Sequence, residues 1–219
     1  ASDVYKRQLV ARFGLPPFIA TLGMLNIARG LALVIADLRP IYFPDQPGFN
    51  EFFMGSIMED MGLPDLPNLF FVFVVAAVVT WFILGKTIVG RYIFAIGSNE
   101  DATRLSGVRT MRYKASAYII SGTMAGLAGV VLAARLNSAQ PSTGFGYELE
   151  AIAAAVIGGT SLAGGEGTIT GTIIGAFIIS VLTNGLRLMG IPQEWQITIT
   201  GVIVIGAVYL DILRRRQKA

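Results

Sequence analysis

The chain has 219 residues, 53% of them hydrophobic and only 14% charged, a balance typical of membrane proteins with several spans. Neither cysteine nor histidine occurs in it, which excludes disulfides, thiol nucleophiles, imidazole bases and the usual zinc sites from these residues. The predicted fold class is an all-α, polytopic membrane bundle of about six apolar segments, one of them short and interrupted by glycine.

The N-terminal part of the chain predicts one membrane span. Residues 1–8 are polar and without pattern, and we interpret them as a ragged or foreign start before a single transmembrane domain at 9–219. An apolar run covers residues 17–36. Arg29 lies inside this run, where a charge at mid-bilayer costs about 2.5–3.5 kcal/mol. We expect Arg29 either to reach the membrane surface or to face a translocation path.

Two loops of opposite charge flank the second predicted span, residues 69–85. Residues 37–68 are acidic and rich in proline, and their carboxylates fit no calcium-binding loop, so they predict a solvated external loop rather than a metal site. Residues 86–114 are basic, which predicts a cytoplasmic location.

The basic loop contains signals for a short helix. Residues 98–101 supply capping side chains and first-turn acids, and Gly107 is placed to end a helix over residues 102–106. Such a helix either connects two spans or docks a cytoplasmic partner.

The central stretch, residues 147–175, is the most unusual part of the sequence. After a span at 116–134, residues 151–163 are apolar but amount to about 20 Å of helix, whereas a bilayer core of about 30 Å needs about 20 residues. The residues that interrupt this run are Gly158, Gly159, Thr160 and Ser161. The pattern predicts a broken or re-entrant helix that lines a path, or a tight helix crossing in which glycine serves only close packing.

Two more spans complete the predicted bundle. Residues 168–189 carry the polar Asn184, and residues 195–213 are followed by a basic tail at 214–218. With the basic loop inside, the acidic loop lies outside and the tail inside, provided that the central segment crosses or that it and a neighbouring segment compensate. We therefore expect a multi-pass protein of the bacterial inner (plasma) membrane with a cytoplasmic C-terminus.

No enzymatic motif accompanies the glycines. Residues 158–165 lack the Gly-Lys-Ser/Thr ending of a phosphate loop. Ser161 lies in no Gly-x-Ser-x-Gly elbow and has no histidine to activate it. The chain is therefore not expected to be an enzyme, and any uphill transport would draw on an ion gradient or another subunit.

Several motifs, in order along the chain, resemble one family. They are LPPFIATLG at 15–23, RGLAL at 29–33, AIGSNEDATRLSG at 95–107, SAQP at 138–141 and GYELEAIAAAVIGGTSLAGG at 146–165. Together they resemble the permease subunits of bacterial ATP-binding cassette importers for monosaccharides (ribose, xylose and arabinose), with the ribose permeases nearest. Because the family's chains are longer, the resemblance implies that residues 9–219 are the C-terminal part of a longer permease.

The resemblance implies partners and site residues. A second permease subunit, as a homodimer or heterodimer, would share the path in the lipid bilayer. Cytoplasmic ATP-binding subunits would use ATP and magnesium, a periplasmic protein would deliver the sugar, and neither a cofactor in this chain nor nucleic acid is implied. The ATPase-coupling loop, residues 97–108, would use Gly97, Asn99, Glu100, Ala102, Arg104 and Gly107. Asp101 departs from the family pattern, which often has alanine there.

The predicted path is less sharply defined than the coupling loop. Its candidate residues are Arg29, Gly158, Gly159, Thr160, Ser161 and Asn184. The alternatives are an ion-coupled secondary transporter, a membrane scaffold that transports nothing, and a permease for another solute such as a branched-chain amino acid or a sugar-derived signal.

Overall fold

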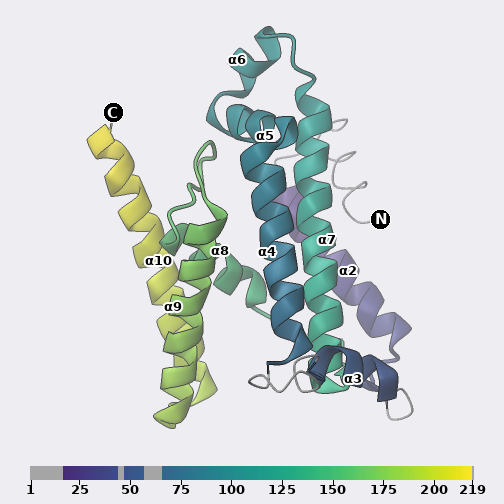
Figure 1. Ribbon diagram of the computed structural model, residues 1–219. Coiled ribbons are helices and arrows are strands. Elements are labelled where there is room, and N and C mark those ends of the chain that lie inside the picture. The colour runs from purple at the N-terminus through teal and green to yellow at the C-terminus, as the bar shows by residue number, and fades with distance from the viewer. Residues whose placement is uncertain (1–16, 44–46, 57–65, 219) are drawn as a thin grey trace. The chain divides into compact units, whose positions relative to one another are not determined.

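A computed structural model describes residues 17–43, 47–56 and 66–218, and most of them are helical (Figure 1). The chain divides into two compact units, Ala1–Val79 with Met111–Thr143, and Thr80–Thr110 with Gly144–Ala219. The expected boundary between residues 8 and 9 lies outside the described residues. So do four acids of the predicted external loop, which are Asp45, Glu59, Asp60 and Asp65.

Long apolar helices account for most of the first unit. Helix α2 is Pro17–Ile35, and it begins at a proline, which fits the first turn because its missing N–H costs nothing there. Helix α4, Asn68–Lys86, continues into the second unit, and helix α7 is Thr110–Leu136. Each of these helices matches a predicted span, and α7 is longer than predicted at both ends.

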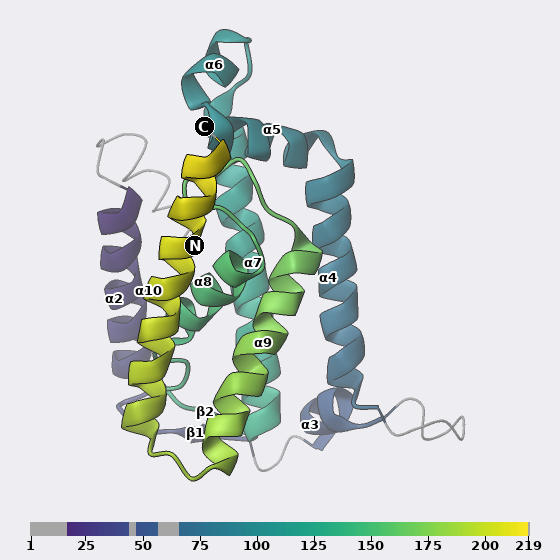
Figure 2. The same cartoon turned by 90° about the vertical axis from the view of Figure 1, so that its left-hand side faces the viewer.

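The predicted external loop contains regular structure. Strand β1, Ile41–Tyr42, pairs antiparallel with strand β2, Ser138–Ala139 (Figure 2). Helix α3, Pro47–Met54, is joined to the start of α4 because the Asn68 side-chain amide donates a hydrogen bond to the Phe52 carbonyl at 2.9 Å. This part of the segment therefore contains regular structure that was not predicted, while its solvated, external position stays a prediction.

Five further helices lie in the described part of the second unit. They are α5 (Ile88–Ser98), α6 (Glu100–Leu105), α8 (Tyr147–Ile157), α9 (Ile169–Leu188) and α10 (Gln193–Lys218). Helix α8 packs against both α9 and α10 (Figure 1). The small side chains of Ala153 and Ala154 are buried there with Ile179 of α9, and Ile203 and Val204 of α10 pack against them.

The described helices have the composition of membrane spans. Among the described residues, α4, α7 and α9 are long and apolar enough to cross a bilayer, and three shorter apolar stretches accompany them: Thr21–Ile35, Ile88–Ser98 and Glu194–Tyr209. Large apolar side chains are exposed along these helices, with Val181 of α9 exposed by 70% and Ile205 of α10 by 72%. Water would penalise so much exposed apolar surface, whereas lipid would not, and the predicted all-α membrane class is confirmed.

Helices α5 and α8 differ in extent from the segments expected from the sequence. Helix α5 lies within residues 86–114, where the sequence predicted a loop with a single short helix further along. Helix α8 begins at Tyr147, directly after Gly146 with φ of 86°, and it ends at Ile157. Helix α8 therefore begins four residues before the apolar run at 151–163, because acids suit the first turn, and it ends where the predicted interruption begins at Gly158.

Candidate functional site

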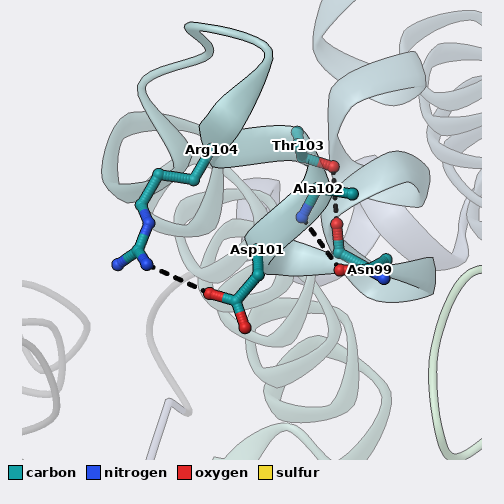
Figure 3. A network of polar contacts seen from close by, with 5 residues as sticks. All are labelled: Asn99, Asp101, Ala102, Thr103 and Arg104. Atoms are coloured by element: carbon teal, nitrogen blue, oxygen red, sulfur yellow. Dashed lines mark hydrogen bonds and ion pairs between the residues drawn. The ribbon is translucent and has the colours of Figure 1, made fainter.

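Helix α6 is a short, exposed helix with a well-defined start (Figure 3). The Asn99 side-chain oxygen accepts a hydrogen bond from the Ala102 N–H at 2.9 Å, and the Thr103 hydroxyl donates to the Asn99 carbonyl at 2.8 Å. Arg104 and Asp101 form an ion pair at 3.2 Å on the exposed surface. The capping residues therefore determine where α6 begins, as predicted, although its bounds are Glu100–Leu105.

The end of α6 exposes a large apolar side chain. Ser106 caps the helix, and Gly107, with φ of 82°, turns the chain in the left-handed region that glycine tolerates best. Leu105, the last helical residue, is 86% exposed. Sequence reasoning did not single out Leu105, although one leucine at the end of an otherwise polar helix was the available signal.

Helices α5 and α6 meet at a hydrogen-bonded corner. The Asn99 N–H donates to the Ala95 carbonyl at 3.0 Å and ends α5, while the same residue begins α6. Of the six predicted coupling residues, Gly97 lies in the last turn of α5 and Gly107 follows α6. The remaining four are at the corner or within α6, so the structure brings this set together.

The break after α8 is a tight, hydrogen-bonded turn. The Ser161 N–H donates to the Glu166 carbonyl at 3.0 Å, and the Gly164 N–H donates to the Ser161 carbonyl at 3.1 Å. Gly159, Gly164 and Gly165 all have positive φ values, between 83° and 93°. The predicted interruption of the central helix is therefore present, and its backbone uses conformations that favour glycine.

Glycines also let α8 and α9 approach closely. A Cβ atom on Gly158 would overlap the backbone of Gly171, and one on Gly175 would overlap the carbonyl of Ala154. The close packing named as one reading of the central stretch is thus present at this crossing. That the same residues line a path stays a prediction.

Two hydroxyl groups, those of Thr160 and Ser161, lie at the break. The Thr160 and Thr172 hydroxyl oxygens are 3.4 Å apart and link the break to α9. Ser161 is only 8% exposed, and among the described residues its hydroxyl has no hydrogen-bond partner. The structure therefore places Thr160 and Ser161 beside the α8–α9 crossing, with one buried hydroxyl available.

Of the other two predicted path residues, Asn184 lies away from this cluster and Arg29 belongs to the first unit. Asn184 is exposed on α9, about 18 Å along the helix axis from Thr172 at 1.5 Å per residue. Arg29 is partly exposed on α2, in the first unit.

Exposed apolar helices, one helix broken by glycine and a short capped helix together define an integral membrane protein of the multi-span helical class. The chain belongs to the family described as "Branched-chain amino acid transport system / permease component", which matches residues 7–208.

Curated relatives are permeases named for sugars. The chain is 44% identical over 204 residues to the ribose import permease protein RbsC of Bacillus subtilis. This match covers 93% of the chain and 62% of the relative. It is 41% identical over 209 residues to the D-allose transport system permease protein AlsC of Escherichia coli. That match covers 94% of this chain and 61% of the relative. The L-arabinose transport system permease protein AraH of the same species is 36% identical over 211 residues. That match covers 96% of this chain and 62% of the relative.

The chain thus spans about three fifths of the length of these relatives. No solved structure matches it. The predicted resemblance to the sugar permease family is confirmed.

Proposed function

We propose that this chain is part of the permease subunit of an ATP-binding cassette importer that carries a monosaccharide, with ribose as the first candidate, across the inner membrane. The observation that carries the proposal is α6, a capped and exposed helix that ends in an exposed leucine. Relatives that are named as ribose, allose and arabinose permeases support a sugar as cargo.

In this proposal α6 docks on a cytoplasmic ATP-binding subunit. A short exposed helix with an apolar anchor and polar neighbours suits a protein interface, since buried apolar anchors supply much of the binding energy. Leu105 is the anchor, and Glu100 and Arg104 lie within the polar surround. ATP and magnesium bind to that partner, while a second permease subunit and a periplasmic sugar-binding protein complete the importer.

The break between α8 and α9 is the proposed contact point for the cargo. A neutral sugar needs hydroxyl and amide partners rather than charges, and Thr160 and Ser161 supply hydroxyl groups. Leaving a buried hydroxyl without a partner costs about 1–3 kcal/mol, which supports a role in binding a passing polar group. ATP-driven movement of α6 then changes access to this region from one side of the membrane to the other.

Other readings have less support. A branched-chain amino acid stays a second candidate because the family description names that cargo. Ion coupling is not favoured, because the sequences of α4, α7 and α9 contain no carboxylate to bind a proton or sodium ion.

Uptake by the reconstituted importer tests the proposal. The complete permease, its ATP-binding subunit and its binding protein are placed in proteoliposomes, and entry of labelled ribose is measured with ATP inside the lumen, where the ATP-binding subunits face. We expect uptake that requires ATP and persists when ionophores collapse proton and sodium gradients. Allose, arabinose and leucine serve as competing cargoes. Uptake that needs an ion gradient and no ATP would contradict the proposal.

A further inference from the structure

Three glycines join the end of α5 to the turn after α8, all within the second unit. A Cβ atom on Gly97 would lie 2.6 Å from the backbone nitrogen of Gly165, and one on Gly164 would lie 2.7 Å from the Gly97 carbonyl oxygen. One on Gly165 would lie 2.9 Å from the Cα atom of Ser98. Real Cβ contacts are longer than this, so two backbones touch here because side chains are absent.

Ser98, which Gly165 approaches, directly precedes Asn99, the corner residue at which α6 begins. Ser98 is the last residue of α5, and Asn99 hydrogen-bonds both to Ala95 of α5 and to Ala102 of α6. A force on α6 therefore reaches Gly97 through helix backbone and hydrogen bonds, without a flexible linker between them.

On the other side, the contact leads to the break. Gly164 and Gly165 belong to the turn that the Ser161–Glu166 and Gly164–Ser161 hydrogen bonds close. A Cβ atom on Gly167 would lie 2.9 Å from the Thr160 hydroxyl oxygen, and Thr160 is linked to Thr172 of α9. Backbone contacts and hydrogen bonds thus run without interruption from α6 to the α8–α9 crossing.

We propose that Gly97, Gly164 and Gly165 form a joint that transmits movement of α6 to the break between α8 and α9. The inference rests on the proposed function, and it assigns Gly97 a positioning role instead of a place in the docking surface. The end of α5 and the turn after α8 move as one body, because adjoining backbones without side chains between them leave little room to slide.

The first test compares Gly97→Ala with Gly85→Ala in the complete importer. Both glycines lie near the end of a helix, but a Cβ atom on Gly85 would meet nothing within 4 Å. For Gly97→Ala we expect normal co-purification of the ATP-binding subunit and continued ATP hydrolysis, with uptake about tenfold below that of Gly85→Ala, a loss in the usual range of coupling between sites. Equal uptake by the two variants would overturn the joint.

A disulfide test decides the matter if Gly97→Ala fails to accumulate in membranes. The 219 residues contain no cysteine, so a pair can be introduced as Ser98→Cys with Gly165→Cys. Thr160→Cys with Thr172→Cys is the positive control, because those hydroxyl oxygens are 3.4 Å apart. Disulfides are quantified by mass spectrometry after mild oxidation, once in the resting importer and once with ATP and the ATP-binding subunit present.

We expect the 98–165 disulfide to form to the same extent with and without ATP and the ATP-binding subunit, because the two backbones of the joint stay in contact when α6 moves. Uptake is not the readout here, since the Cβ atom of Gly165→Cys itself overlaps Ser98. Formation of the control disulfide alone, or of the 98–165 disulfide in only one of the two states, would overturn the proposal. If the unsubstituted importer shows no ATP-dependent uptake, the proposed function fails, and disulfide formation still reports whether the contact exists.

Discussion

Leu105 illustrates what a single exposed residue contributes. Its side chain is 86% exposed at the end of a helix whose other exposed positions are polar or small. Leu188, at the end of α9, is 83% exposed but ends a strongly apolar helix. The two leucines are thus almost equally exposed. The polar neighbours of Leu105 favour the proposed protein contact, whereas the apolar helix that ends at Leu188 favours contact with lipid.

Replacing Leu105 tests the docking surface at the scale of one residue. We expect Leu105→Ala to weaken binding of the ATP-binding subunit by about tenfold, since truncating an interface anchor commonly costs 1–2 kcal/mol or more. The matched control, Leu188→Ala, should bind normally. Affinity is measured by titrating the labelled ATP-binding subunit onto purified permease, and unchanged binding by Leu105→Ala would remove this leucine from the interface.

Glycine has different roles at different positions of the chain. Gly107 adopts a positive φ where nothing approaches it, so its role is conformational. Gly97 has no positive φ and lies against another backbone, so its role is close approach. Gly85 meets neither condition. Counting glycines in a sequence therefore cannot assign their functions.

At the scale of elements, the crossing of α8 and α9 is the main packing contact of the second unit. Helix α8 is 11 residues long and has few large side chains, so it stays in place mainly through close contact with its neighbours. Gly158, Gly171 and Gly175 make that contact possible by letting helix backbones meet.

Gly175→Ala should destabilise this crossing. The added Cβ atom would overlap the Ala154 carbonyl, and overpacking of this kind typically costs about 1–3 kcal/mol. Gly185→Ala, on the same helix with nothing within 4 Å, should be neutral or stabilising by up to about 1 kcal/mol through helix propensity. Thermal unfolding of the two detergent-solubilised variants is the measurement, and equal midpoints would contradict the packing described.

At the scale of the whole molecule, the strand pair constrains the topology. Strand β1 follows α2 and β2 follows α7, and the two pair directly. The chain must therefore leave α2 and α7 on the same side of the membrane. This agrees with the charge pattern, which predicts both segments outside and the basic residues around α6 inside.

Thiol labelling tests this orientation in the complete protein. Ser106→Cys, next to α6, should react with a membrane-impermeant reagent only in inside-out vesicles, and Ser142→Cys, after β2, only in right-side-out vesicles. Both positions are exposed, and the 219 residues contain no other cysteine. Labelling of both variants from one side would contradict the predicted topology. A cysteine added after residue 218 extends the test to the C-terminus, which we propose to be cytoplasmic.

Local sequence was sufficient to predict the long helices and the cap of α6. Apolar runs predicted α4 and α9, and the capping residue Asn99 begins α6 because its side chain accepts a bond from a nearby N–H group. These features depend on residues a few positions apart, and the sequence displays such spacings directly.

Only the tertiary structure decided how the glycine-rich stretch is used. The sequence indicated a break near Gly158, but Gly171 and Gly175 make the crossing tight, and Gly97 is what Gly164 and Gly165 touch. Helix α5 and the β1–β2 pair were likewise missed. The reason is physical: a glycine permits close approach without specifying what approaches, and the backbone that fills the space comes from a distant part of the chain.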